Sequence, residues 1–183
     1  NWVGCYQTTA YCLGSVVGPH PYPTMVRSFQ KIIGEECRLQ LLELHQKLPD
    51  AVFACVGGGS NAAGIFSGFT DDTTVKLIAC EASQAASLTN GSMGVLHGME
   101  SYLLQTAERQ IAETHSISAG LDYPGVGPWL AGLHLDGRLD AMAITDEECV
   151  SALKELATTE GILCALETAH ALAALKKFLK LHA

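Results

Sequence analysis

An uncharged apolar run that leads directly into three consecutive glycines is the feature that most restricts the fold of this chain. The run, AVFACV, covers residues 51–56, and GGGSN follows at residues 57–61. Such a run predicts a strand buried on both faces, as in a parallel sheet flanked by helices. Glycines allow a tight turn close to a ligand, and we expect Ser60 or Asn61 to cap a following helix. Strand, loop and helix N-terminus together predict an anion-binding loop, most often for phosphate.

The composition indicates one compact domain and argues against several functional classes. The 183 residues are 48% hydrophobic and 16% charged, which is typical of a globular protein with a working core. A net charge of -8 without clustered Lys and Arg argues against nucleic-acid binding. No apolar run reaches the roughly 20 residues that a membrane-spanning helix needs. Seven widely spaced cysteines without a CxxC pair are typical of a reducing compartment and argue against zinc.

Apolar periodicity and turn residues predict alternating helices and strands in the first half of the chain. The glycine- and proline-rich residues 18–23 predict an extended connector. Thr24 is expected to cap a long helix. The expected elements are a helix over 24–45, a strand over 51–56, a short helix over 61–69 and a second buried strand over 75–80.

The second half is expected to contain long loops, one more strand and two helices. Residues 81–99 look loop-like, and residues 118–128 are too rich in Gly and Pro for a regular element. A strand over 140–145 precedes a helix over 146–159, for which Thr145 and Glu148 form a capping box. A final helix starts near Leu166.

This alternation predicts the α/β class, a three-layer sandwich with a mostly parallel sheet flanked by helices. We expect residues 1–48 to be a connector and long helix, and residues 49–183 to be an α/β domain that binds a phosphate group. No strand is expected before the connector or after the last helix, although a late helix in such a sheet is normally followed by a strand. The chain is therefore expected to be a piece of a longer, two-domain subunit.

The glycine loop has two functional interpretations and one without a ligand. Contiguous glycines followed by Ser60 and Asn61 suit a cup for a single phosphate group. Alternatively, Gly57-x-Gly59-x-x-Ala62 matches a variant of the dinucleotide fingerprint, with Glu81 about 20 residues on as the acid for the ribose. A tight turn that binds nothing remains open.

Three polar residues in the C-terminal half are further candidates for a site. Asp122 lies in the glycine-rich loop, where it either caps a turn or meets a substrate hydroxyl. Glu167 lies in an apolar stretch, where a partly buried carboxylate needs a partner. Glu167 and His170 are three residues apart and could share a metal, but no second such pair exists, which favours a solvated or hydrogen-bonded face.

Four long strings resemble the β subunit of tryptophan synthase, in that family's order and nearly at its spacing. They are GPHPYP at residues 18–23, CVGGGSNA at 55–62, SISAGLDYPGVGP at 116–128 and EGIxxALExxHALA at 160–173. The resemblance implies a lyase of fold type II that uses pyridoxal 5'-phosphate and joins L-serine and indole to give L-tryptophan. It also implies a cytoplasmic location, or a plastid in a plant or alga.

The resemblance also implies roles for individual residues. Glu167 would lie beside the pyridine ring and favour β-elimination and replacement over transamination. Asp122 would meet the serine hydroxyl or help to close the loop over the reacting substrate. The residues implied to contact the cofactor, apart from Glu167, are Gly57, Gly58, Gly59, Ser60 and Asn61 at the phosphate, and Gly120 nearby.

A monovalent cation and protein partners follow from the same resemblance. The main-chain carbonyls of Gly57, Tyr123 and Gly125 would bind Na+ or K+. The implied partners are an α subunit that makes indole and a second β subunit in a homodimer. Nucleic acid and membrane are not expected as partners.

The chain departs from the family pattern in ways that keep other functions open. The lysine that binds the cofactor covalently belongs to an HKxN string upstream of the glycine loop, and Lys31 and Lys47 lack that context. The family's later SGRGDKD string is also missing. We therefore expect this chain to be inactive alone. The alternatives are a truncated, non-catalytic homologue that binds phosphate or a partner, and another lyase or synthase of fold type II.

Overall fold

Three parallel strands form the centre of the protein in a computed structural model that describes residues 5, 7–10 and 14–181. They are β1 (Ala51–Cys55), β2 (Lys76–Ala82) and β5 (Leu139–Ile144), with β2 in the middle. Ala51 is aligned with Lys76, and Leu77 with Leu139. Because the strands are parallel, the loops that follow them leave the same edge of the sheet.

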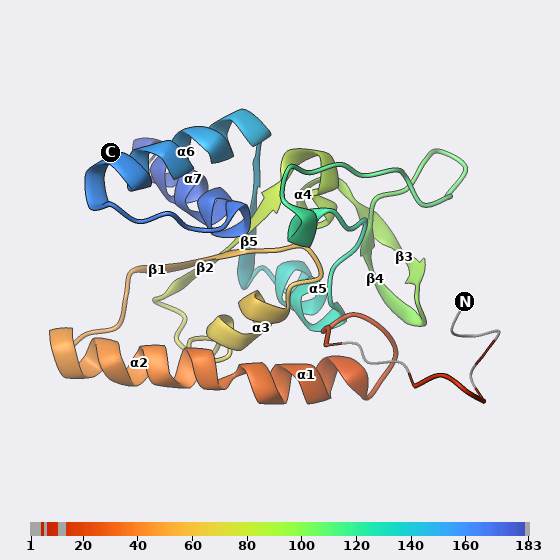
Figure 1. Cartoon of the computed structure of the whole chain (residues 1–183). Coiled ribbons are helices and arrows are strands. Elements are labelled where there is room, and N and C mark those ends of the chain that lie inside the picture. Colours follow the sequence, from red (N-terminus) through yellow and green to blue (C-terminus); the bar gives the residue numbers. More distant parts are fainter. Residues whose placement is uncertain (1–4, 6, 11–13, 182–183) are drawn as a thin grey trace.

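Helices cover both faces of this sheet, as Figure 1 shows. On one face lie α3 (Ser60–Phe66) and α5 (Pro128–Leu135), with α1 (Tyr22–Gln30) and α2 (Ile32–His45) packed outside α3. On the other face lie α6 (Asp146–Glu160) and α7 (Leu166–Leu181). The predicted α/β class, with a parallel sheet flanked by helices, is confirmed.

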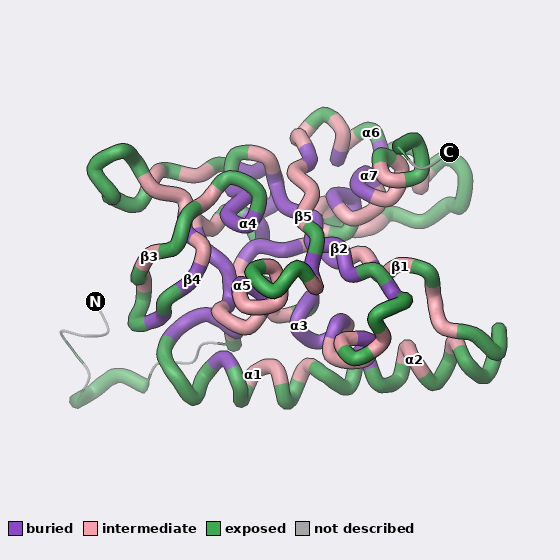
Figure 2. Tube along the Cα trace, turned by 180° about the vertical axis from the view of Figure 1, so that it is seen from behind, coloured by how far each residue is buried: buried purple, intermediate pink, exposed green. Residues whose placement is uncertain are grey.

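The sheet separates two apolar cores. Val52 and Leu77 point toward α3 and α5, whereas Ile78 points toward α6 and α7. Phe53 meets Phe178 of α7 edge-on, with ring centroids 5.4 Å apart. Figure 2 shows the buried residues concentrated on the strands and on the inner sides of the helices. β2 is buried from Leu77 onward, while β1 alternates between buried and half-buried residues.

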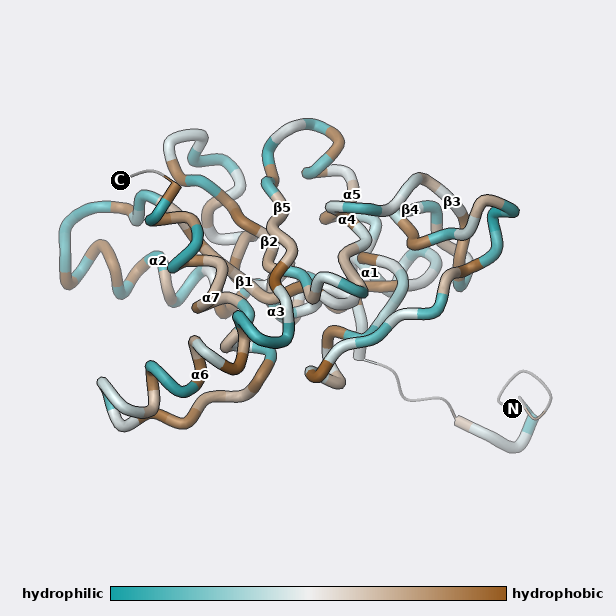
Figure 3. Tube along the Cα trace, turned by 90° about the horizontal axis from the view of Figure 1, so that it is seen from above, coloured by the Kyte–Doolittle hydropathy of each residue, from teal (hydrophilic) through white to brown (hydrophobic). Residues whose placement is uncertain are grey.

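The outer helices α1 and α2 contain both hydrophilic and hydrophobic residues, whereas the central strand β2 is mostly hydrophobic. In Figure 3, β2 is mostly in hydrophobic colours, whereas α2 alternates between hydrophilic and hydrophobic residues. Phe29, Leu39 and Leu44 on α1 and α2 are among the most exposed apolar side chains. Within the residues that the structure describes, no helix has the length and apolar character that a membrane crossing requires.

The expected helix over 24–45 is present but starts earlier and is interrupted. It begins at Tyr22, with Pro23 in its first turn, and breaks at Lys31 into α1 and α2. Thr24 lies inside α1, so the prediction that it caps the helix is wrong. Proline has the φ angle that a first helical turn needs, and this allows the helix to extend into the predicted connector.

The expectation of a loop over residues 81–99 is also wrong. This region contains α4 (Ser87–Asn90), β3 (Ser92–Leu96) and the start of β4 (Met99–Leu103), and β3 and β4 form an antiparallel hairpin. The sequence of β3, SMGVL, has no run of apolar residues, so pairing with β4 rather than local propensity makes it a strand. α5 is also not predicted by the sequence patterns, because a proline starts this helix and Gly132 lies in its interior.

The C-terminal predictions are confirmed closely. Thr145 Oγ1 accepts a hydrogen bond from Glu148 N at 3.2 Å, and Glu148 Oε2 accepts one from Thr145 N at 2.9 Å. This capping box starts α6, and Gly161 ends it with a left-handed φ of 69°. The last helix begins at Leu166, as expected.

Candidate functional site

The glycine loop connects the carboxyl end of β1 to α3. Gly59 is the N-cap residue of α3, and its φ of 95° suits glycine. The expectation that Ser60 or Asn61 caps this helix is wrong, because both lie in its first turn and bond elsewhere. Ser60 Oγ accepts a hydrogen bond from Val16 N at 3.2 Å, and Asn61 Nδ2 donates one to Cys55 O at 3.0 Å. These side chains stabilise the shape of the loop.

The backbone N–H groups of residues 57–61 form a set of donors at the carboxyl end of β1, next to the start of α3. None of them donates a hydrogen bond to another of the residues that the structure describes. Gly58 O is engaged, because it accepts a hydrogen bond from Gly127 N at 2.9 Å. The loop is therefore held by its carbonyl and side-chain groups, while its donors remain available. A set of free N–H groups after a strand suits the oxygens of a phosphate group.

Gly120 packs directly against the glycine loop. A Cβ added at Gly57 would overlap the carbonyl oxygen of Gly120 and approach Leu121 Cα to 3.1 Å. Gly120 belongs to a short 3-10 turn, η3 (Ala119–Leu121), which corrects the expectation that residues 118–128 contain no regular element. Since Pro128 starts α5, the glycine-rich segment is also shorter than expected.

Glu167, a carboxylate in an apolar stretch, has a hydrogen-bond partner in Gly120. Its Oε1 accepts a hydrogen bond from Gly120 N at 3.0 Å. The carboxylate is half-buried in the first turn of α7, which lies on the opposite face of the sheet from α3. The structure thus brings together three predicted site residues, Gly57, Gly120 and Glu167, from separate parts of the chain.

The side chains of Glu167 and His170 bond to different partners and do not form a pair that could share a metal. His170 Nδ1 lies 2.9 Å from Leu166 O and 3.2 Å from Ser118 Oγ, whereas Glu167 binds Gly120 N. In the described ranges, no group of three or more His, Cys, Asp and Glu residues is arranged to hold a metal. The hydrogen-bonded interpretation of this helix face is confirmed.

Asp122 follows the 3-10 turn and is exposed to solvent. Its neighbour Tyr123 stacks against His97, with Tyr123 Oη 3.0 Å from His97 Nδ1, and burial raises the pKa of Tyr123. Gly125 pairs with Leu103 in an isolated β-bridge. A cation bound by the carbonyls of Gly57, Tyr123 and Gly125 stays a prediction.

Glu81 has a structural role instead of the contact with a ribose that the dinucleotide alternative required. Its carboxylate is fully buried and accepts hydrogen bonds at the start of α4. The donors are Leu88 N at 2.7 Å, Thr89 N at 2.9 Å, Thr89 Oγ1 at 2.7 Å and Ser87 Oγ at 3.4 Å. Burial raises the pKa of Glu81, and these bonds oppose that effect. The dinucleotide interpretation loses its ribose-binding acid.

Sequence reasoning missed two contacts at the site. Cys55 lies at the base of the glycine loop, with its Sγ 3.5 Å from Asn61 Nδ2, and burial raises the pKa of the thiol. Ser118 contacts His170, and both residues are buried. The spacing of Glu167 and His170, three apart on one helix face, was the only sequence signal for the second contact.

Four of the seven lysines have partners away from the glycine loop. Lys31 pairs with Glu35, Lys176 with Glu155, and Lys177 with Glu148. Lys76 lies at the amino end of β2, the opposite edge of the sheet, above the Phe178 ring. Among the described residues, no hydrogen bond or ion pair joins a lysine to residues 57–61.

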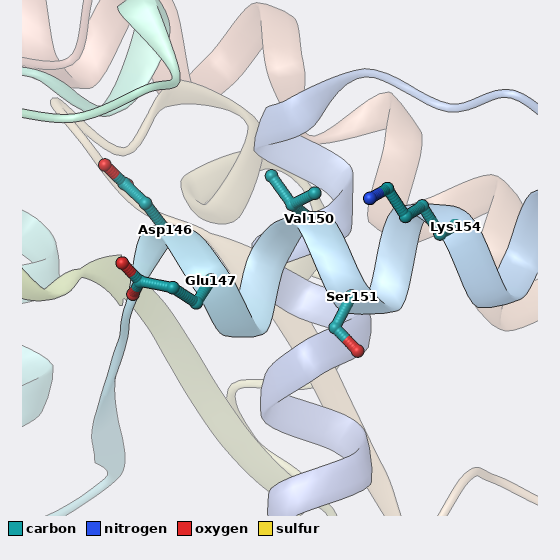
Figure 4. A pocket seen from close by; sticks show the side chains of 5 residues that line it. All are labelled: Asp146, Glu147, Val150, Ser151 and Lys154. Atoms are coloured by element: carbon teal, nitrogen blue, oxygen red, sulfur yellow. The ribbon is translucent and has the colours of Figure 1, made fainter.

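A shallow surface pocket on α6 lies apart from these residues. Figure 4 shows the side chains that line it, which are Asp146, Glu147, Val150, Ser151 and Lys154. A second hollow, between α6 and α7, is lined partly by Lys176, Lys177 and Lys180. Neither contains a residue of the glycine loop, Gly120 or Glu167.

The fold and site define an α/β domain that presents a glycine loop, with backbone N–H groups that have no acceptor in the described part of the chain, at the carboxyl edge of a parallel sheet. The chain belongs to the pyridoxal-phosphate dependent enzyme family, whose sequence model matches residues 10–183. It has the fold type II architecture of that family. The family implies pyridoxal phosphate as cofactor, and the free N–H groups of the glycine loop suit its phosphate.

Two solved structures share this fold. A threonine deaminase from the organism abbreviated T.th. matches with a TM-score of 0.65 and 22% identity, over 86% of this chain and 49% of that chain. An L-serine ammonia-lyase from the fungus Rhizomucor miehei matches with a TM-score of 0.62 and 20% identity, over 88% and 47%. The chain therefore spans about half the length of these enzymes.

Proposed function

We propose that the protein containing this chain is a pyridoxal-phosphate dependent lyase of the tryptophan synthase β type, which joins L-serine and indole. The observation that carries the proposal is the hydrogen bond between Glu167 Oε1 and Gly120 N, 3.0 Å long. It joins two of the strings on which the resemblance rests, beside the glycine loop that forms a third. Strings that are distant in sequence meet at one place, as expected for parts of one active site.

The chain's own residues would hold the cofactor at its phosphate and near its ring. The N–H groups of residues 57–61 would bind the phosphate oxygens, and Glu167 would lie near the ring with Gly120. The chemistry supplied by bound pyridoxal phosphate is electron withdrawal from the amino acid. A carboxylate near the ring edge suits elimination and replacement at the β-carbon.

Asp122 would act on the substrate side of the site. It is exposed, and it follows the 3-10 turn that packs against the glycine loop through Gly120. From this position a carboxylate can accept a hydrogen bond from a substrate hydroxyl and help a loop exclude water. The carbonyls of Gly57, Tyr123 and Gly125 are proposed to bind a monovalent cation.

The partners and location are proposed on the resemblance. They are an α subunit that supplies indole, a second copy in a homodimer, and the cytoplasm or a plastid.

A second candidate is a lyase that acts on a hydroxy amino acid without joining a second substrate. The names of the two similar structures, a threonine deaminase and an L-serine ammonia-lyase, favour it. Both candidates use an amino acid with a β-hydroxyl group. They differ in whether a second substrate, indole, is joined to it. The third candidate is a non-catalytic homologue that only binds phosphate.

The test is an assay of the full-length protein that contains this chain. It is given pyridoxal phosphate with L-serine and indole, L-serine alone, or L-threonine alone. Production of tryptophan only when indole is present supports the proposal. Ammonia and a 2-oxo acid from serine or threonine, without tryptophan, would favour the deaminase. Cofactor binding without any product would indicate the non-catalytic homologue.

A further inference from the structure

We propose that His170 and Ser118 are positioning residues that hold the loop bearing Gly120 and Asp122 in place at the candidate active site. Neither residue needs to touch the cofactor or the substrate. Together with Glu167 and Gly120 they form a two-point attachment of this loop to α7, here called the α7 clasp. The link to catalysis rests on the proposed function, whereas the attachment itself does not.

The first attachment is the contact between His170 and Ser118. His170 Nδ1 lies 2.9 Å from Leu166 O, and a carbonyl only accepts, so Nδ1 carries the hydrogen. Ser118 Oγ, 3.2 Å from the same nitrogen, is the second acceptor. His170 and Ser118 are 0% and 1% exposed, so water does not compete for this bond.

Ser118 transmits its position to the 3-10 turn that carries Gly120. Its N–H donates to Ser116 Oγ at 3.0 Å, and its carbonyl accepts from Leu121 N at 3.0 Å. Its backbone N–H, its carbonyl and its hydroxyl oxygen all have partners. A change in the Ser118 side chain therefore acts on η3, which begins at the next residue.

The second attachment is the bond from Gly120 N to Glu167 Oε1. Glu167 and His170 are three residues apart on α7, so both face the loop, and their partners are two residues apart in it. Two bonds fix the orientation of the loop, which a single bond does not. Gly120 in turn packs against Gly57, so the clasp determines how the loop meets the glycine loop.

The unpaired Nε2 of His170 indicates that the value of a histidine here lies in the hydrogen bond of its other nitrogen, Nδ1. His170 Nε2 is buried and has no partner among the described residues, which is unfavourable for stability. A hydrocarbon side chain would fill the space without that cost. What histidine adds here is the Nδ1 hydrogen bond, which is the contact that positions Ser118.

Neighbouring elements support the same arrangement. Asp146 Oδ1, at the start of α6, accepts a hydrogen bond from Ile117 N at 3.3 Å. Cys149 Sγ, also on α6, lies 3.3 Å from Leu166 O, the carbonyl that His170 uses. The clasp thus sits where α6, α7 and the loop meet at the carboxyl end of β5.

The test is hydrogen exchange of the segment 117–122 in the full-length, ligand-free protein. His170→Phe and Ser118→Ala should each increase exchange in this segment at least tenfold. His170→Asn should restore protection to within threefold, because its amide N–H can replace Nδ1. Ser87→Ala removes a buried serine hydroxyl at Glu81 and is the matched control, with no change in this segment.

The expected pattern separates positioning from general stability. If His170→Phe and Ser118→Ala leave exchange unchanged, or if His170→Asn fails to restore it, the proposal is overturned. If His170→Phe does not fold, Ser118→Ala alone decides in the same way. Because no ligand or turnover enters this measurement, the failure of the proposed function would leave its result intact.

A titration with pyridoxal phosphate then connects the clasp to the site. Cofactor fluorescence should show at least threefold weaker binding in Ser118→Ala than in Ser87→Ala. Equal affinities would overturn the link to the active site. If the wild-type protein itself does not bind pyridoxal phosphate, the proposed function fails, and the exchange experiment still decides whether the clasp exists.

Discussion

Glu167 Oε1 accepts a hydrogen bond from Gly120 N at 3.0 Å, across a separation of 47 residues in the chain. Glu167 begins the last helix, and Gly120 lies in the loop that packs on the glycine loop. The bond places a carboxylate beside a potential phosphate site while engaging only one of its oxygens with a described residue. The carboxylate therefore has a fixed position and remaining capacity to interact with a ligand.

Replacing Glu167 should alter reaction specificity more than cofactor binding. In the full-length protein, Glu167→Ala should lower the ratio of tryptophan to pyruvate at least tenfold, while its loss of affinity for pyridoxal phosphate should be no larger than that of Ser118→Ala, because each variant removes one attachment of the α7 clasp. Glu167→Gln keeps an acceptor for Gly120 N but removes the charge, so it separates positioning from electrostatics. The measurement is product analysis with L-serine and indole. An unchanged product ratio in Glu167→Ala would show that the carboxylate does not direct the chemistry.

Asp122→Ala should produce a different defect from Glu167→Ala. Asp122 is exposed and makes no side-chain contact that the structure records among its described residues, so resting cofactor absorbance should stay unchanged. Turnover of L-serine should fall at least tenfold, because the substrate side of the site loses an acceptor. Steady-state rates and absorbance spectra of both variants provide the comparison. The same defect at the same step in both variants would contradict this division of roles.

Gly57→Ala should weaken cofactor binding by moving two loops apart. The added Cβ would overlap Gly120 O, and neither backbone can move away without altering the site. Affinity for pyridoxal phosphate should fall at least tenfold, or about 1.4 kcal/mol. Gly132→Ala in α5 is the control, since its Cβ meets nothing within 4 Å and should raise helix stability by about 0.5–1 kcal/mol. Equal affinities of the two variants, by fluorescence titration, would be inconsistent with the proposed site.

The 183-residue chain alone should form no specific covalent adduct with pyridoxal phosphate. Its upstream lysines lack the family context, and Lys31 is exposed and paired with Glu35. Borohydride reduction followed by peptide mapping should show only slow, scattered labelling. Stoichiometric labelling of one lysine would refute this expectation and identify an unexpected cofactor lysine.

Glu81 should make stability depend on pH. Burial raises its pKa in the folded protein above the ordinary value of 4.5. Its contribution to stability is therefore fully present below about pH 4.5 and is lost as the pH rises through the folded-state pKa. Glu81→Gln should remove this dependence and cost about 1–3 kcal/mol, because its NH2 group then faces donors at Thr89.

Urea unfolding of the wild type and Glu81→Gln at several values between pH 4.5 and 8 measures this effect. The stability advantage of the wild type should decrease as the pH rises. An advantage that grows with pH would mean that the four hydrogen bonds outweigh burial and hold Glu81 as an anion.

Local sequence determined the features whose partners are close in the chain. The apolar residues 51–56 and the glycines after them specify a strand and a tight turn, because both depend on neighbouring residues. The capping box of Thr145 and Glu148 has the same property, since its partners are three residues apart. The parallel sheet, α6 and the start of α7 follow from such patterns, and anion binding by the loop stays a prediction from them. Even here local rules had a limit, because long-range bonds from Ser60 and Asn61 replaced the expected cap.

The tertiary structure alone decided the features whose partners are distant. β3 becomes a strand only by pairing with β4, since its own residues carry little strand signal. Glu81 follows a buried strand where a ligand-binding acid is possible, yet the fold places α4 over it and engages its carboxylate. Glu167 and His170 looked like a possible metal pair until the loop supplied separate partners, Gly120 and Ser118. A carboxylate or an imidazole can serve many roles, and the partner that long-range packing brings to it selects among them.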